Sequence, residues 1–225
     1  MLLHGLTDVN QVHKRGTSPL YIASQNGHCD VAEILLRSQA DVSQARKDGA
    51  SPLFVTSQNG HRELAEILLQ TKQMSAMLGT MAPPLFLLPP NLAELLLHNQ
   101  VDVNRTGSNG ASSLFVASIT GHCEVAGLLL CNKADFNQVQ NKGASPLSIA
   151  SQKGHLKLAE LLLRHQADID HARKDGPSPL FITSDNGHHE IAELLLRNKA
   201  DVNLAEKHGV SIPRPGPQTQ PAGAA

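Results

Sequence analysis

The fold of this chain is decided by the stretch from residue 18 to residue 50, which reads SPLYIASQNGHCDVAEILLRSQADVSQARKDGA. Ser18 is a residue type that caps helix N-termini, and Pro19 is favoured at the first helical position, where its missing N–H costs nothing. The helix that they begin, residues 20–26, is expected to end at Gly27, because glycine readily adopts the left-handed backbone of a helix C-terminus.

A second helix is expected over about residues 29–38, since its apolar residues fall at helical spacing. The pattern predicts a water-facing side with Asp30, Glu33 and Arg37, and a buried side made of Val31, Ala32, Ile34, Leu35 and Leu36. The chain then passes through residues 40–42 to a glycine-containing turn at residues 47–49. Each unit is therefore two antiparallel helices and an extended, turn-rich finger, and it must stack on neighbours to bury its apolar face.

The unit recurs along the chain, which indicates a repeat architecture. Its start, Ser18-Pro19-Leu20, returns at residues 51, 145 and 178, with Ser112-Ser113-Leu114 as a variant. Its Gly27-His28 pair returns at residues 60, 121, 154 and 187. Successive starts follow one constant period, that from Ser18 to Ser51, except between Ser51 and Ser112, where the step is two periods less five.

This unit resembles the ankyrin repeat in its 33-residue period, its Ser-Pro-Leu start, its Gly-His turn and its Ala-Asp pair, and the resemblance covers about residues 1–212. It implies an all-α fold: an ankyrin-repeat solenoid of stacked antiparallel helix pairs joined by β-hairpin or turn fingers. Two positions depart from the family. Its histidine after Pro-Leu is replaced by Tyr21, Phe54, Phe115, Ser148 and Phe181. Its glycine before Ala-Asp is replaced by Gln39, Gln73, Gln100, Lys133, Gln166 and Lys199, which would then occupy a left-handed turn at some cost in stability.

The period divides the array at residues 1–212 into a partial unit at 1–14, repeats at 15–47, 48–80, 81–108, 109–141, 142–174 and 175–207, and a partial unit at 208–212. The unit at 81–108 is degenerate, because Leu87-Leu88-Pro89-Pro90-Asn91 replaces its Gly-His turn and the four residues between its two proline pairs are too few for a full helix. We interpret it either as a tolerated lesion that weakens the stack or as a hinge or docking patch. The array could then behave as two blocks, 1–80 and 91–212.

The two ends of the chain break the period. We expect either frayed ends or a fragment of a longer array, because neither end shows the polar cap of a complete array. Residues 213–225 are rich in Pro, Gly, Ala and Gln, and we expect them to be a disordered tail.

Composition narrows the function classes. The net charge of −1 gives no general attraction for nucleic acid or anionic lipid, so neither nucleic-acid binding nor membrane insertion is expected. Three cysteines, Cys29, Cys123 and Cys131, are too few for a disulfide framework. No signal peptide or membrane-spanning stretch is readable. These features predict a soluble cytoplasmic protein, or a nuclear one.

No chemistry-bearing motif stands out from the repeat. Five histidines, at 28, 61, 122, 155 and 188, occupy one repeat position, so we interpret them as structural rather than as metal ligands. The aspartates of the Ala-Asp pairs suit turn capping. We expect no enzyme activity, no cofactor, no metal and no small-molecule substrate.

The remaining candidate for function is a surface, because ankyrin proteins usually bind partners through the finger tips and the adjacent first helices, which form a concave strip. We predict a protein-interaction scaffold whose partner is unidentified. Alternatives are the substrate-recognition part of a ubiquitin-ligase adaptor, or a regulatory fragment of a larger multidomain protein. Arg46, Lys47, Arg173 and Lys174 give two tips a basic bias that would favour an acidic partner. The candidate contact residues on the tips are Lys14, Arg15, Lys47, Asp48, Ser108, Asn109, Asn141, Lys142, Lys174 and Asp175, and those on the first helices are Gln25, Asn26, Gln58, Asn59, Gln152, Lys153, Asp185 and Asn186.

Overall fold

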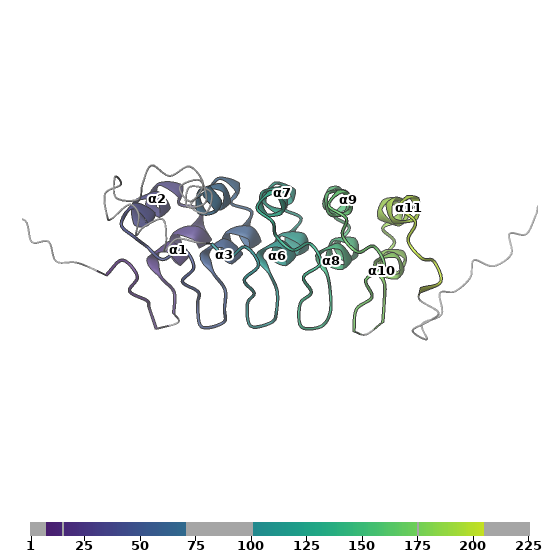
Figure 1. The fold of residues 1–225 in the computed structure, drawn as a ribbon, viewed down its shortest axis with the longest axis horizontal. Helices are drawn as coiled ribbons and strands as arrows, with labels where there is room; N and C mark the ends of the chain where they lie inside the picture. Colours follow the sequence, from purple (N-terminus) through teal and green to yellow (C-terminus); the bar gives the residue numbers. More distant parts are fainter. Residues whose placement is uncertain (1–7, 15, 71–100, 175, 205–225) are drawn as a thin grey trace, which may run out of the picture.

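A computed structural model describes residues 8–14, 16–70, 101–174 and 176–204 of the chain. The described part is a row of helix pairs, with the first helices in one layer, the second helices in another, and the fingers projecting together from one side (Figure 1). The first helices are α1 (Pro19–Asn26), α3 (Pro52–Asn59), α6 (Ser113–Thr120), α8 (Pro146–Lys153) and α10 (Pro179–Asp185). The second helices are α2 (Cys29–Arg37), residues 62–70, α7 (Cys123–Cys131), α9 (Leu156–Arg164) and α11 (His189–Arg197). This all-α solenoid is the fold that the repeat predicted.

The first helices begin and end where the sequence places them. The hydroxyl of each preceding serine, from Ser18 to Ser178, accepts the backbone N–H of the third helical residue at 3.1–3.3 Å. Each helix is followed by a glycine in the left-handed region, directly or, after α10, one position later; examples are Gly27 at φ 72° and Gly121 at φ 78°. Capping and termination therefore confirm the prediction made from Ser-Pro-Leu and Gly-His.

The turns after the second helices contain the strain that the sequence implied. Gln39, Lys133, Gln166 and Lys199 all have φ between 65° and 67°. A side chain in this left-handed region costs about 1–2 kcal/mol relative to the ordinary helical region. Residues 73 and 100, where the same substitution was expected, lie outside the described residues.

The fingers are narrow loops closed by hairpin-type hydrogen bonds. Each has a bond from the N–H of one residue to the carbonyl four positions later, as from Arg46 to Ala50 at 2.9 Å and from Gln140 to Ala144 at 3.1 Å. Within the described residues, one isolated bridge, Thr106 to Ser112, is the only β pairing. The base of each finger is an aspartate turn, as at Asp41, whose Oδ1 accepts the N–H of Ser43 at 2.8 Å. The turn-capping role expected of these aspartates is confirmed.

The core is aliphatic and runs along the whole described row, between the two helix layers. Its fully buried side chains are mostly leucines, among them Leu53, Leu114, Leu147 and Leu162. Alanines at the middle of the second helices, such as Ala126, let neighbouring helices approach closely. The first repeat departs from the predicted buried face, since Val31 and Ile34 are exposed while Ala32 and Leu36 are buried.

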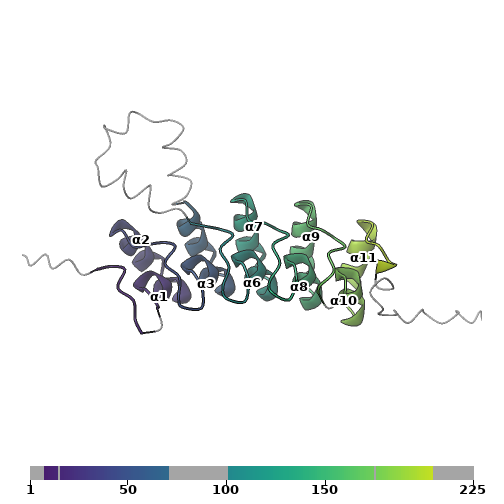
Figure 2. The same ribbon diagram turned by 60° about the horizontal axis from the view of Figure 1, so that its bottom comes forward.

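Most of the unit expected at residues 81–108 lies outside the described residues, and the repeats on either side of it are in contact. Helix α3 packs directly against α6, so the repeats that begin at Ser51 and Ser112 are immediate neighbours (Figures 1 and 2). Residues 101–108 supply the finger between them: Val101 and Val103 join the core, and the N–H of Ser108 donates to the Asp48 carbonyl at 2.8 Å. Along the described stack, the repeat that begins at Ser112 therefore follows the one that begins at Ser51 directly.

The expected prolines and apolar loop of residues 81–100 lie outside the described residues, as do the tail at 213–225 and most of the two partial end units. Among the residues that the structure describes, no helix is long and apolar enough to cross a lipid bilayer.

Candidate protein-binding surface

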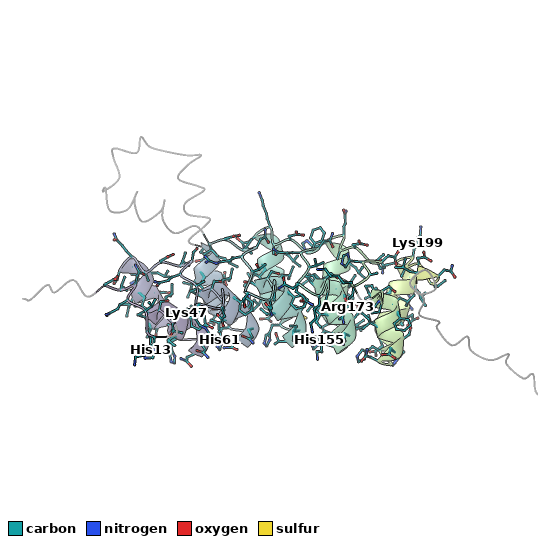
Figure 3. All side chains as sticks on the ribbon, turned by 90° about the horizontal axis from the view of Figure 1, so that it is seen from below. His13, Lys47, His61, His155, Arg173 and Lys199 are labelled. Atoms are coloured by element: carbon teal, nitrogen blue, oxygen red, sulfur yellow. The ribbon has the colours of Figure 1, made fainter. Side chains whose placement is uncertain are left out.

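The finger tips lie side by side along one edge, and the three middle tips are tied to one another through their backbones. The N–H of Ser108 donates to the Asp48 carbonyl, and that of Asn141 donates to the Asn109 carbonyl at 3.0 Å. Figure 3 shows this side of the molecule, with Lys47 and Arg173 on separate fingers along the row. We call this edge, together with the exposed ends of the first helices, the finger strip.

The predicted tip residues are exposed wherever the structure describes them. They are Lys14, Lys47, Asp48, Ser108, Asn109, Asn141, Lys142 and Lys174. Arg15 and Asp175 lie outside the described residues. Lys47 and Lys174 pack their side-chain stems on Gly16 and Gly143 of the preceding finger, and their backbone N–H groups lie there too. The lysine stems are thus anchored at their base.

Several predicted tip residues hold the fingers together instead of being available to a partner. Asp48 accepts the N–H of Ala50 and pairs with Arg46. Asn109 accepts the N–H of Ala111 at 3.0 Å, and the Asn141 amide donates to the Ser108 carbonyl at 3.2 Å. By contrast, the ammonium groups of Lys14, Lys47, Lys142 and Lys174 make no hydrogen bond or ion pair with any described residue.

The predicted first-helix residues divide in the same way. Gln25, Asn26, Gln58, Asn59, Lys153, Asp185 and Asn186 are exposed, and Gln152 is half-buried. The amides of Asn26 and Asn186 donate to carbonyls of their own helices, and the Asn59 amide donates to the Gln25 carbonyl of the preceding repeat at 2.8 Å. Gln25, Gln58, Lys153 and Asp185 remain as side chains that the described stack does not use.

Two arginines of the strip point inward, which the sequence analysis missed. The Arg46 guanidinium lies 5.4 Å from the centre of the Tyr21 ring and donates to the Tyr21 hydroxyl at 3.4 Å. Arg173 donates to the Ser148 hydroxyl at 2.9 Å and to the Gln152 side-chain oxygen at 2.8 Å. Both arginines thus donate hydrogen bonds to the residue, Tyr21 or Ser148, that stands where the family has histidine.

The signal for these contacts was present in the sequence. Arg46 and Arg173 each stand at the same distance along the chain from the substituted position of their repeat, and the polar residues among the substitutes are Tyr21 and Ser148. Burial raises the pKa of the Tyr21 hydroxyl, with the Arg46 charge acting in the opposite direction. Hydrogen bonding to Asp48 raises the pKa of Arg46. The basic bias expected at two tips therefore comes from Lys47 and Lys174, whereas the arginine charges are engaged within the stack.

The repeated histidines form a ladder between neighbouring repeats. The Nε2 atoms of His61, His155 and His188 lie 3.1 Å from backbone carbonyls at the ends of the preceding first helices, those of Gln25, Ile119 and Gln152. Because a carbonyl only accepts, Nε2 must carry the proton in this contact. Each ring also lies against the glycine that ends that helix. These contacts support the structural interpretation for His61, His155 and His188, and His122 packs in the same way on Gly60, whereas His28 is exposed. Among the described residues, no three His, Cys, Asp or Glu side chains gather in a way that could hold a metal ion.

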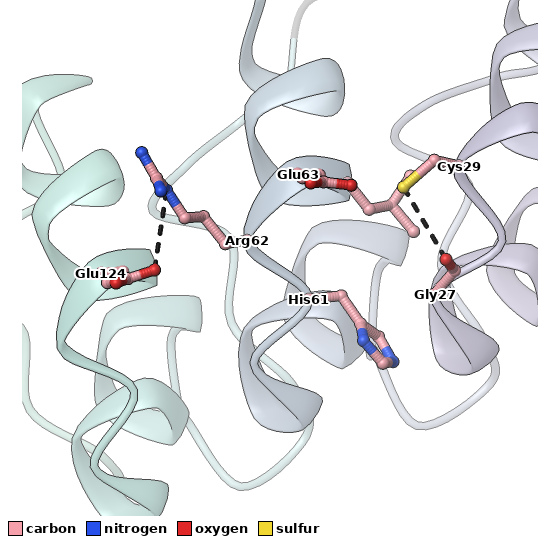
Figure 4. A pocket seen from close by; sticks show the side chains of 7 residues that line it. Gly27, Cys29, His61, Arg62, Glu63 and Glu124 are labelled. Carbon is pink, nitrogen blue, oxygen red and sulfur yellow. Dashed lines mark hydrogen bonds and ion pairs between the residues drawn. The ribbon is translucent and has the colours of Figure 1, made fainter.

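An open pocket lies between the starts of neighbouring second helices (Figure 4). His61, Cys29 and the exposed ion pair of Arg62 with Glu124, at 3.7 Å, line it. Burial raises the pKa of the Cys29 thiol, and the charges of Glu63, Asp30 and Glu33 raise it further. A thiol in acidic surroundings stays protonated, so Cys29 lacks the activation that a nucleophilic cysteine needs.

The stack and its landmarks place the chain in a family. A protein-family model that describes three copies of the ankyrin repeat matches residues 1–77 and 114–206. The chain therefore belongs to the ankyrin repeat family. A search of curated proteins gives no match. Ankyrin repeats are in general protein–protein interaction modules, and the family is typically non-enzymatic.

Proposed function

We propose that this chain is a protein-interaction scaffold that binds its partner along the finger strip, through the four tip lysines Lys14, Lys47, Lys142 and Lys174. The observation that carries the proposal is the contrast between these side chains and their neighbours. The asparagines and Asp48 of the tips hold the fingers together, while the lysine ammonium groups are exposed and unused by the described stack.

The lysines favour a partner segment that carries carboxylates. Two of them, Lys47 and Lys174, have stems anchored on the preceding finger, which reduces the side-chain entropy lost on binding. Because the fingers stand side by side, an extended acidic segment laid across them would meet successive ammonium groups. Such contacts contribute to specificity and to the association rate, and they weaken as salt is added.

The test is affinity capture with the double charge reversal Lys47→Glu and Lys174→Glu. We expect partners of the unmodified chain to bind about tenfold more weakly, which corresponds to about 1.4 kcal/mol. The matched control is Lys157→Glu, an exposed lysine on α9 and so in the layer of second helices. If every identified partner keeps its affinity for the double variant, the finger strip is not the binding surface.

A further inference from the structure

The middle finger of the described stack, residues 102–111, lacks a side chain that the fingers beside it have. Gly107 stands at the repeat position of Arg46. The Arg46 guanidinium reaches back to the first helix before its finger, where it lies 5.4 Å from the centre of the Tyr21 ring. The equivalent ring before the middle finger is Phe54 in α3. Because Gly107 has no side chain, the middle finger gives Phe54 no such cover.

The burial of the first helices follows this position of the fingers. Tyr21 is 4% exposed, Phe115 6% and Ser148 0%, and the finger that follows each of them carries a side chain at this position. Phe54, by contrast, is half-buried. A Cβ at Gly107 would stand 3.7 Å from Phe54 Cε2, an ordinary contact distance, and Gly107 does not have the left-handed backbone that favours glycine. A side chain would therefore fit there, and its absence leaves part of the Phe54 ring accessible.

A second half-buried apolar side chain, Ile119, stands near the end of α6, the helix that follows the middle finger. The other first helices have a polar residue at this position, namely Gln25, Gln58, Gln152 and Asp185. Phe54 and Ile119 both pack against a small apolar cluster that is separate from the main core and consists of Ala111, Phe115, Val116, Ala144 and Ile149. We call Phe54, Ile119 and the backbone of Gly107 the central apolar patch.

The charges of the finger strip lie on either side of this patch. The tip of the middle finger, residues 106–109, has no charged side chain. The finger before it carries the exposed Lys47, and the finger after it carries the exposed Lys142. The charge of Asp48 on the first of these fingers is paired with Arg46. The patch is therefore an uncharged surface between two unpaired ammonium groups.

The spacing of these groups defines the length of a segment that fits them. Packed neighbouring helices lie about 8–10 Å apart, so the fingers that carry Lys47 and Lys142, two steps apart, are separated by about 16–20 Å. An extended chain covers this distance in about five or six residues, at about 3.3 Å per residue. Its alternate side chains point to the same side, so two apolar side chains at alternate positions can face Phe54 and Ile119 between the two lysines.

We propose that the central apolar patch binds an extended partner segment in which two apolar side chains, at alternate positions, stand between two carboxylates about six residues apart. The inference rests on the function proposed for the finger strip and specifies the partner. The lysines alone would accept any acidic segment, whereas covering Phe54 and Ile119 removes apolar surface from water only when the segment has apolar side chains at its centre.

The test uses two labelled synthetic peptides and the full chain in low-salt buffer, with binding measured by fluorescence anisotropy. The first peptide is Glu-Ser-Leu-Ser-Leu-Ser-Glu, and in the second both leucines are replaced by serine. We expect the leucine peptide to bind about tenfold more tightly, since burial of two leucines can supply more than this factor.

Gly107→Gln and Ile119→Gln are each expected to remove most of this preference and to leave the affinity for the serine peptide unchanged. Neither substitution changes the charge, and each introduces the residue that the array itself has at the same position, Gln140 or Gln58, so the stack is kept. Gln25→Ala, at the position of Ile119 in α1, is the matched control and leaves both affinities unchanged.

Equal affinities for the two peptides overturn the inference. So does a preference for leucine that persists in both glutamine variants, or a leucine peptide that does not bind. The double charge reversal Lys47→Glu and Lys142→Glu tests the proposed function separately, because it should weaken both peptides. If it does so while neither peptide is preferred, the proposed function stands and this inference fails. If it changes neither affinity, the proposed function fails, and with it the carboxylates of this segment.

Discussion

At the scale of single residues, the glycines that end the first helices have a left-handed backbone, and most of them also have a histidine ring packed against them. Gly187 has the backbone but not the ring, so the two effects can be measured separately. Gly121 has φ 78°, and a Cβ there would lie 2.7 Å from the His155 ring; Gly187 has φ 72° and open space. We expect Gly187→Ala to cost about 1–2 kcal/mol from backbone strain alone. Gly121→Ala should cost clearly more, because His155 must also move away from the Ile119 carbonyl. Urea unfolding of dilute protein measures both, and equal losses would show that the histidine contact contributes nothing.

The left-handed turns after the second helices offer the reverse experiment. Lys133→Gly and Gln166→Gly remove side chains from positions at φ 66° and 65°. Each is expected to stabilise the fold by up to about 1 kcal/mol, since the relief of strain exceeds the extra entropy of glycine in the unfolded chain. The melting temperature should rise by about 2–4 °C for each kcal/mol. Lys157→Gly, at an exposed position of α9, serves as the control. It should lower the free energy of unfolding by about 1 kcal/mol, because glycine has a low helix propensity. A fall at Lys133 and Gln166 would contradict the strain argument.

Features of single residues that depend on the local chain could be predicted from the sequence, whereas those that depend on distant residues could not. The caps, the glycine turns and the left-handed glutamines and lysines were predictable, because each depends on backbone chemistry within a few positions. The exposure of Val31 and Ile34 was not, since burial of one repeat depends on whether another repeat stands before it. The inward direction of Arg46 and Arg173 depends on a distant partner in the chain, Tyr21 or Ser148, which a period search alone does not pair.

At the scale of elements, the long step from Ser51 to Ser112 shows the limit of period arithmetic. It equals two periods less five or one period plus an insertion, and the resemblance of residues 84–86 and 92–97 to other repeats favoured the first interpretation. Packing favours the second, because α3 lies directly against α6 and the Arg62–Glu124 pair bridges their repeats. Only the spatial neighbours of a helix distinguish the two, and these are not encoded in spacing.

A deletion tests this interpretation. Removing residues 72–99, the length by which the step exceeds one period, joins Thr71 to Gln100 and reproduces the spacing of Ser38-Gln39-Ala40. The shortened chain should keep the stack and gain about 2 kcal/mol if the long connection costs closure entropy of the usual size. Circular dichroism and thermal unfolding measure this. As a control, deleting a segment of equal length, 113–140, removes the α6 and α7 pair and should destabilise the array. Loss of cooperative folding in the 72–99 deletion would mean that the stack needs this segment.

At the scale of the whole molecule, the remaining question is whether the array acts as one stack or as two blocks, 1–80 and 91–212. In such arrays each repeat is stabilised by its contacts with its nearest neighbours. The contact between α3 and α6 has the same glycine–histidine packing as the other contacts between repeats. Tyr21 is the single tyrosine, no tryptophan is present, and its fluorescence therefore reports on the first repeat alone. Leu162 in α9 and Leu68 in the helix at 62–70 are equivalent and fully buried, one on each side of the junction.

Replacing either leucine by alanine removes a comparable volume and should cost about 2–5 kcal/mol in its own repeat. Leu68→Ala lowers the denaturant midpoint seen by Tyr21 whether there is one stack or two blocks, because both residues lie on the same side of the junction. Leu162→Ala lowers the Tyr21 midpoint only if coupling crosses from α6 to α3. We expect a fall smaller than that for Leu68→Ala but measurable, because the effect passes through several interfaces. An unchanged Tyr21 midpoint, with a lowered transition in circular dichroism, would separate the array into two blocks in spite of the direct contact between α3 and α6.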